Sequence, residues 1–295
     1  MGNVSVMTDS VACLPREMAG EMNIRVIPSA NIMFGGRSYI DGETITPSEA
    51  YELIRKDPDS FVTSAITPAY VMDAYRDLSA TSGEILFITI ASALSAVFKT
   101  ASTAAELFRT ESPGTTVRVV DSRACGSTQG LVVLAAARAA AEGRSLDEVA
   151  SIVGQVRQKT GGLMMLDTLR YIYRTGRMSK VASRIASIFN IRPINRVSDE
   201  GTIEMVDRAR KRIDGLSRML SLIGKEAGTR DLHFMLTHAD APEMAEGFTE
   251  LLRQEYNCLS LVVSDYSPVM GYGSGPGALF IGFHPELDLS VQTDM

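Results

Sequence analysis

Short apolar runs alternate with helical patterns along the first part of the chain. The runs from Val4 to Met7, from Ile85 to Ile90 and from Val117 to Val120 are rich in β-branched residues, and each ends at polar or small residues. Each run leads into a helical pattern, such as the Ala-rich stretch from Leu131 to Glu142. This rhythm is typical of a parallel β-sheet with connecting helices. We therefore expect an N-terminal α/β domain over residues 1–160.

The pattern becomes less regular after Gly161-Gly162. Strand-like segments are here interleaved with two long helical patterns: the strand candidates are residues 163–166, 202–206, 233–237, 260–263 and 278–283, and the helix candidates are residues 209–226 and 241–256. The sequence predicts a second, α+β domain over residues 161–295. No low-complexity segment, long linker or internal repeat is visible, so we expect the two domains to pack closely and to form a cleft.

Small hydroxyl residues stand where apolar runs give way to helical patterns. The two clearest cases are Val62-Thr63-Ser64 and the segment from Ile90 through Ser92 and Leu94 to Ser95. A helix start leaves several backbone N–H groups without partners and carries a partial positive charge, so it can hold a carboxylate or phosphate. Neither segment supplies an acid, a base or a metal ligand. The pair favours a protein that holds an anionic small molecule without necessarily transforming it.

The polar ends of the predicted strands should meet at one crevice, because ligands of parallel sheets sit beyond the carboxyl ends of the strands. These ends are Thr8-Asp9-Ser10, Ala91-Ser92 and Asp121-Ser122. Thr67 before Pro68, and also Ser92, have the pattern of helix N-caps. Capping alone explains most single hydroxyls at such positions, so the prediction of an anion site depends on their grouping.

Composition and charge exclude several classes of protein. With 295 residues and 45% hydrophobic content the chain can bury a large core, and its net charge of −6 argues against a nucleic-acid partner. Cys13, Cys125 and Cys258 have no metal-binding or disulfide spacing, which fits a reducing cytoplasm. No apolar run approaches the roughly 18 residues of a membrane span, and Asp9 interrupts any signal core. We expect a cytoplasmic protein without stable membrane insertion.

The remaining motifs offer little support for catalysis. Residues 271–278 contain G-x-G-x-x-A, but only 17 residues follow Ala278, too few to complete a dinucleotide-binding unit. The histidines are His233, His238 and His284, and none has the spacing of a helical metal site. A serine hydrolase would have to bring one of them to Ser92 or Ser10 from a distance. The basic run at residues 208–212 opens a predicted helix and is either a solvated face or a cation for a ligand head group.

Nine short motifs follow one another in a recognisable order. They are Thr8-Asp9-Ser10 with Leu14-Pro15, Val26-Ile27-Pro28, Tyr39-Ile40-Asp41-Gly42, Thr63-Ser64, Ser92-Ala93-Leu94-Ser95, Val120-Asp121-Ser122, Asp167-Thr168-Leu169, Gly176-Arg177 and Gly275-Pro276-Gly277. This order resembles that of the DegV family, the bacterial fatty-acid-binding proteins that include the FakB subunits of fatty acid kinase. The likeness covers nearly the whole chain.

The resemblance implies a two-domain α/β protein with a long-chain fatty acid in a tunnel between the domains. It implies that Thr63 and Ser92 hydrogen-bond the carboxylate and that Arg210 lies near the head group. With their neighbours, the expected ligand-binding residues are Thr63, Ser64, Ser92, Ser95, Arg210, Gly273 and Ser274. Such a carrier is not an enzyme and needs no cofactor. In the FakB members, a separate kinase subunit, FakA, phosphorylates the bound acid.

This chain departs from the family pattern beside the expected head group. Gly273 replaces the histidine that commonly stands two residues before G-P-G. Glycine offers only backbone groups and extra room, so we expect the protein to bind lipid but to serve a FakA-like kinase poorly. The alternatives are a carrier or sensor of a different amphiphilic lipid and, less favoured, a serine hydrolase.

Overall fold

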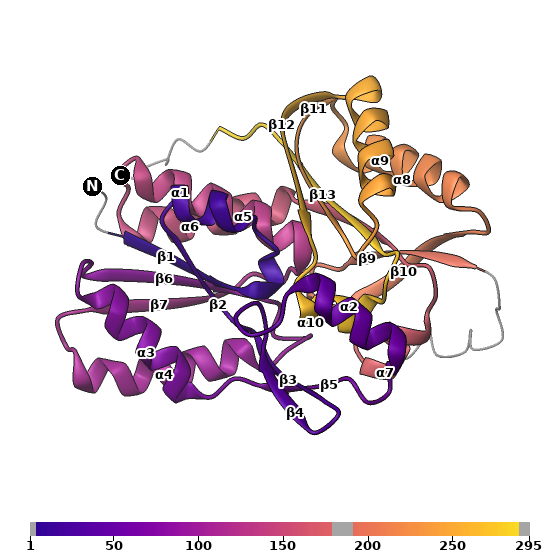
Figure 1. The fold of residues 1–295 in the computed structure, drawn as a ribbon. Helices are drawn as coiled ribbons and strands as arrows, with labels where there is room; N and C mark the ends of the chain where they lie inside the picture. The colour runs from indigo at the N-terminus through magenta and orange to yellow at the C-terminus, as the bar shows by residue number, and fades with distance from the viewer. Residues whose placement is uncertain (1–3, 179–190, 289–295) are drawn as a thin grey trace.

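The computed structural model describes residues 4–178 and 191–288, which form three β-sheets with helices packed around them (Figure 1). The first sheet is parallel, with strand order β2-β1-β6-β7. Its strands are β1 (Val4–Asp9), β2 (Ile24–Ile27), β6 (Glu84–Thr89) and β7 (Thr116–Asp121). The parallel α/β arrangement predicted for the start of the chain is therefore confirmed.

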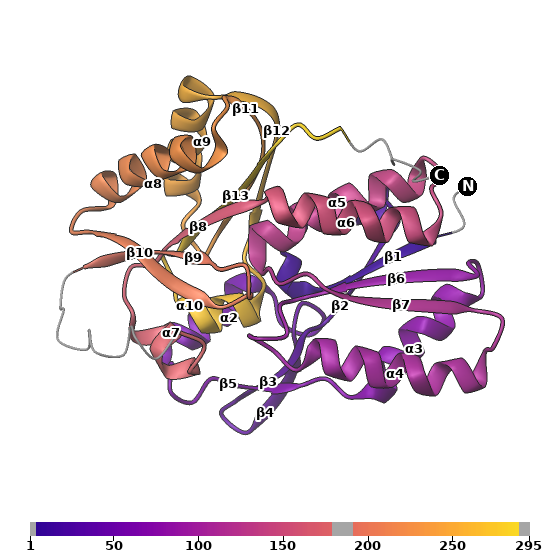
Figure 2. The ribbon, with the colours of Figure 1, turned by 180° about the vertical axis from the view of Figure 1, so that it is seen from behind.

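Helices cover both faces of the parallel sheet. They are α1 (Arg16–Glu21), α3 (Pro68–Ser79), α4 (Val97–Glu111), α5 (Gly126–Ala141) and α6 (Leu146–Lys159). Figures 1 and 2 show α3 and α4 on one face and α1, α5 and α6 on the other. The Thr67 hydroxyl caps α3 by accepting a hydrogen bond from the Tyr70 backbone N–H, as the sequence predicts.

A small antiparallel sheet lies below the first sheet in the view of Figure 1. Its strand order is β4-β3-β5, with β3 at Ala30–Phe34, β4 at Arg37–Ile40 and β5 at Val62–Ala65, and helix α2 (Pro47–Lys56) lies between β4 and β5 in the chain. Thr63 and Ser64 therefore belong to a strand, and the expectation that they stand at a helix start is wrong. The helix begins three residues after β5, behind its own Thr67 cap.

The third sheet is mixed, with strand order β10-β9-β8-β13-β11-β12. Only β11 and β12 pair in parallel. The strands are β8 (Gly161–Met165), β9 (Arg192–Val197), β10 (Ile203–Ala209), β11 (Asp231–His238), β12 (Asn257–Asp265) and β13 (Leu279–Pro285). All five strand candidates of this half are confirmed, whereas β9 was not predicted.

Helices α8 (Arg212–Ala227) and α9 (Pro242–Glu255) pack on one face of the mixed sheet. Both were predicted, but α8 begins at Arg212, so the basic run at residues 208–212 spans the end of β10 and the start of the helix rather than opening it. Leu163, Phe234 and Ile281 point toward these helices and form a separate core with them.

Helix α5 packs between the parallel and the mixed sheets, and nearly all of its residues are buried. Because the helix is buried on all sides, its sequence is apolar throughout and shows no amphipathic pattern. Gly282 of β13 makes this contact possible, because a Cβ there would lie 2.8 Å from the Ser127 carbonyl carbon. The Ser127 hydroxyl also donates to the Phe280 carbonyl at 2.7 Å. Helix α5 thus joins the two halves of the chain, and a domain boundary at residue 160 stays a prediction.

Candidate functional site

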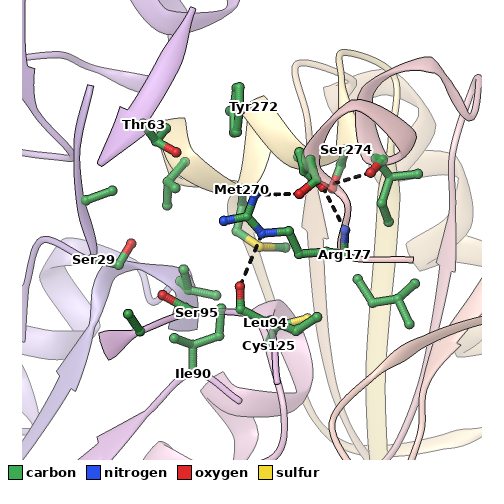
Figure 3. A pocket seen from close by; sticks show the side chains of 18 of the residues that line it. Ser29, Thr63, Ile90, Leu94, Ser95, Cys125, Arg177, Met270, Tyr272 and Ser274 are labelled. Carbon is green, nitrogen blue, oxygen red and sulfur yellow. Dashed lines mark hydrogen bonds between the residues drawn. The ribbon is translucent and has the colours of Figure 1, made fainter. Parts of the chain in front are cut away.

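A cavity of about 190 Å³ is lined by residues of the small and mixed sheets and of the segments that follow strands of the parallel sheet (Figure 3). A buried water needs only about 10–15 Å³ on the same scale, so the space suits a small molecule. Helices α7 (Arg170–Thr175) and α10 (Pro268–Ser274) complete the wall. Its main apolar side chains are Val11, Ile90, Leu94, Met164, Ile172 and Met270. Such a surface binds a hydrocarbon by removing it from water.

Hydroxyl groups line the same cavity. They belong to Ser29, Thr63, Ser64, Ser95, Thr175 and Ser274. Thr63, Ser64, Ser95, Ser274 and Gly273 were expected at the ligand site from the sequence, and the structure brings these five to one wall. Ser29 and Thr175 were not expected, because neither stands in a segment whose pattern indicates an anion site.

Ser92 lies outside the described wall of the cavity. It is exposed, and its hydroxyl donates to the Asp121 carboxylate at 2.5 Å, while its backbone N–H donates to the same carboxylate at 3.1 Å. Ser92 also does not cap a helix, because α4 begins at Val97 behind Ala96. Ser95, three residues further on, lines the cavity in its place.

Arg177, rather than Arg210, is the cation in the described cavity wall. Arg210 is exposed between β10 and α8, and its carbonyl accepts a hydrogen bond of 2.6 Å from Arg192. Arg177 donates to the carbonyls of Leu94 at 3.3 Å and Thr175 at 2.7 Å, and its guanidinium extends toward the side of the cavity where Thr63 and Ser95 lie (Figure 3). The Gly176-Arg177 motif was the available signal for this residue, but the motif alone does not indicate where the side chain points.

Helix α10 presents one glycine to the core and another to the cavity. A Cβ on Gly271 would lie 2.6 Å from the Tyr51 ring, so the core excludes a side chain there. A Cβ on Gly273 would meet nothing within 4 Å, and Gly273 lines the cavity. The glycine-rich segment is thus a short helix that ends at Gly275, and Gly273 leaves open space beside the hydroxyl groups.

Tyr272 lines one side of the cavity, and contacts with Phe61 and Arg174 fix its ring. Its ring stacks on Phe61 with the centroids 5.8 Å apart. The guanidinium carbon of Arg174 lies 4.8 Å from the centre of the Tyr272 ring, and Arg174 pairs with Asp59 at 3.4 Å. These contacts join α7, α10 and the segment before β5, which fixes the aromatic side of the wall.

The carboxyl ends of the first-sheet strands lie together, but their polar residues do not form the ligand crevice predicted from the sequence, because none of them is among the described residues that line the cavity. The Asp9 carboxylate at the end of β1 accepts a hydrogen bond of 2.7 Å from the Ile90 N–H just after β6, and Ser92 pairs with Asp121 at the end of β7. Burial raises the pKa of Asp9 to about 7. This carboxyl is therefore held behind the cavity wall, where it does not face the ligand space.

The described cavity wall contains no histidine. His233 instead bonds Ser260 at 2.9 Å and Glu286 at 2.6 Å, and its ring stacks on His284. The described lining serines therefore have no imidazole base beside them. Over residues 4–178 and 191–288 we also find no cluster of potential metal ligands and no helix long and apolar enough to cross a membrane.

Relatives with known structures share this fold. A DegV family protein from Thermus thermophilus whose structure concerns fatty acid binding is 25% identical, with a TM-score of 0.87 over 96% of this chain and 100% of that chain. The structure of DegV, a fatty acid binding protein from Bacillus subtilis, superimposes with a TM-score of 0.85 over 97% of this chain and all of that chain, at 24% identity. The second likeness shows the fold alone.

Sequence comparisons agree over almost the full length. A DegV domain-containing protein from Caldanaerobacter subterraneus subsp. tengcongensis is 29% identical over 286 residues, which cover 96% of this chain and 99% of the relative. The family model described as "Uncharacterised protein, DegV family" matches residues 3–286. With the fold described above, this match shows that the chain belongs to the DegV family.

Proposed function

We propose that the protein binds a long-chain fatty acid in this cavity and acts as a carrier without catalysing a reaction on it. One observation supports the proposal above all: an apolar wall adjoins several hydroxyls and one arginine, with no histidine among the described lining residues. Hydroxyls and a cation suit a carboxylate head, and the apolar wall suits its tail. The fatty acid binding of the Thermus thermophilus relative supports the same function.

The hydroxyls of Thr63 and Ser95 are the best donors for the carboxylate. A serine hydroxyl has one proton to donate and two lone pairs. Ser95 uses a lone pair to accept from the Val97 N–H at 3.4 Å, which leaves its proton for a ligand. Ser92, in contrast, already donates its proton to Asp121. Within the described structure Thr63 makes no side-chain hydrogen bond.

Arg177 supplies a positive charge opposite the carboxylate, and the neighbouring polar groups offer the head group further hydrogen-bond partners. Its guanidinium carries more donors than its two bonds to backbone carbonyls use. Ser64 and Ser274 line the same space, and the Ser274 hydroxyl donates a weak hydrogen bond to the Met164 sulfur at 3.7 Å.

The tail supplies most of the binding free energy. At about 0.8 kcal/mol per buried methylene, roughly 14 methylenes contribute on the order of 11 kcal/mol before the costs of ordering. One hydrogen bond to a charged head contributes about 1.5–3 kcal/mol. The head group therefore sets the register of the ligand, whereas the wall sets the affinity.

The open space at Gly273 favours a second candidate, a carrier of an amphiphile with a larger head group. Beyond its chain neighbours and the backbone of its own helix, nothing lies within 4 Å of a Cβ placed there, so the cavity can take a head bulkier than a carboxylate. Presentation of the bound lipid to a FakA-like kinase is a further part of the proposal, which the missing histidine makes less favourable.

Lipid extraction and mass spectrometry of the purified protein test the function. We expect close to one fatty acid per protein, whereas an unrelated protein purified in parallel from the same cells gives none. A stoichiometric amphiphile with another head group would favour the second candidate. If no lipid is extracted and the delipidated protein takes up neither palmitate nor oleate, the proposed function is wrong.

A further inference from the structure

Two aspartates from the sequence motifs lie buried behind the cavity wall and take no part in the head-group site. Asp9 belongs to Thr8-Asp9-Ser10 and Asp41 to Tyr39-Ile40-Asp41-Gly42. The two residues are 0% and 1% exposed. A buried carboxyl is costly unless hydrogen bonds compensate it, so the partners of each carboxyl indicate what it does.

Both oxygens of Asp9 accept backbone N–H groups from the cavity wall. Oδ1 accepts from Val11 at 3.1 Å, and Oδ2 accepts from Ile90 at 2.7 Å. Val11 and Ile90 both line the cavity, yet they come from different elements, the short 3-10 helix after β1 and the segment after β6. One carboxylate thus fixes the spacing between two parts of the apolar wall.

We propose that Asp9 is a positioning residue of the cavity, and that its ionised carboxylate holds Val11 and Ile90 where the lipid tail packs. This inference rests on the proposed function. A protonated carboxyl carries a hydrogen on one oxygen, and that O–H would face an N–H donor. A backbone N–H cannot accept that proton, and the hydroxyl oxygen of a neutral carboxyl accepts more weakly than a carboxylate oxygen, so protonation weakens one of the two bonds and loosens one side of the wall.

Asp41 provides a comparison within the same chain, because most of its hydrogen-bond partners are hydroxyl groups, which can either donate or accept. Its Oδ1 accepts from the Val269 N–H at 3.1 Å, and its Oδ2 accepts from the hydroxyls of Ser10 and Ser29. A hydroxyl can donate or accept. A neutral group at Asp41 therefore keeps its hydrogen bonds, whereas protonation of Asp9 weakens one of its two backbone bonds, and Asn at position 9, whose NH₂ cannot accept, loses one.

The electrostatic surroundings place the Asp9 titration near neutral pH. Burial is the main cause that raises the pKa of Asp9 to about 7, and the nearby Asp41 carboxylate raises it further, while the Ile90 and Val11 N–H groups and Gln129 lower it. The Cys125 thiol also faces Asp9, and burial raises the pKa of that thiol to about 12, so it stays neutral. As the pH falls through about 7, Asp9 gains a proton.

The test compares fatty acid affinity as a function of pH in three proteins: the unmodified protein, Asp9→Asn and Asp41→Asn. Asn at position 9 has one NH₂ in place of an acceptor oxygen, so it imitates the protonated state. We expect the affinity of the unmodified protein to fall by at most about tenfold per pH unit below the Asp9 pKa. Asp9→Asn should bind weakly without that step. Asp41→Asn should keep the step but at lower pH, because it removes a like charge.

The controls separate this inference from the proposed function. Titration of the ligand itself is common to all three proteins, so only differences between their profiles count, and melting curves at each pH monitor folding. An Asp9→Asn profile parallel to that of the unmodified protein overturns the inference. If Asp9→Asn does not fold, an unshifted step in Asp41→Asn overturns it. Absence of fatty acid binding by the unmodified protein at every pH contradicts the proposed function instead.

Discussion

Replacement of Gly273 by leucine should abolish tight lipid binding without weakening the fold. Gly273 lines the cavity, and a Cβ at this position meets no atom within 4 Å. The leucine side chain therefore enters the ligand space rather than the core. Glycine within a helix costs about 1 kcal/mol relative to a good helix former, so the substitution should leave the melting temperature of the free protein unchanged or slightly higher.

Leucine fills space beside the head group and shifts the ligand along the cavity, so the size of the effect follows from the length of tail that is no longer buried. The roughly four side-chain carbons of leucine occupy the space of about four methylenes, each worth about 0.8 kcal/mol when buried. The loss of about 3 kcal/mol corresponds to an affinity roughly two orders of magnitude lower. Stability and affinity thus change independently, or even in opposite directions, which simple unfolding cannot produce.

Displacement of a fluorescent fatty acid measures this affinity, and Gly247→Leu is the matched control. Gly247 lies in helix α9, an added Cβ there also meets nothing within 4 Å, and the residue does not line the cavity. The control should bind lipid as the unmodified protein does. Unchanged affinity in Gly273→Leu would refute the placement of the tail and head in this cavity.

Further predictions concern the head group, access to the cavity and the kinase. Ser95→Ala should weaken binding by about 1.5–3 kcal/mol in the same displacement assay, because it removes a donor to a charged head. Ser92→Ala should have no effect. A larger loss of affinity in Ser92→Ala than in Ser95→Ala would restore the sequence-based assignment of Ser92 to the carboxylate. Alkylation of Cys125, a buried thiol in the cavity wall whose pKa is raised to about 12, should be slow in the free protein and slower still with bound palmitate, whereas alkylation of the partly exposed Cys258 should not change; mass spectrometry of the labelled peptides would show both rates unchanged by palmitate if lipid binds elsewhere. The loaded protein should yield little acyl phosphate with a purified FakA-type kinase and ATP, and Gly273→His should yield more; efficient turnover of the unmodified protein would show that no histidine is required.

Much of the fold could be predicted because its central strands are continuous apolar runs. Strand β6 is buried along almost its whole length, and such a run is readable without knowledge of its neighbours. The sheet β4-β3-β5 could not be predicted in this way. Its strands are short, and Met33 and Val62, which face each other in the register, are 42% and 47% exposed. Strands β4 and β5 contain no buried residue, so their sequences show no clear alternation to detect.

The candidate site was predicted only in part, because its wall depends on where local elements begin. Thr63 and Ser95 follow from segments that stood out in the sequence, but Ser92 and Ser95 are three residues apart, and the start of α4 at Val97 decides which one faces the cavity. Helix α7 ends at Thr175, and the side chain of Arg177 then reaches the site and donates a hydrogen bond to the Leu94 carbonyl. Contacts between distant segments of this kind leave no periodic signal.

A crystal structure of the protein with palmitate tests the central claim most directly. We expect the carboxylate within about 3 Å of the hydroxyls of Thr63 and Ser95, the guanidinium of Arg177 near the same head group, and the tail against Val11 and Ile90. A ligand bound outside this cavity, or one whose carboxylate contacts none of the three polar side chains, would contradict the account.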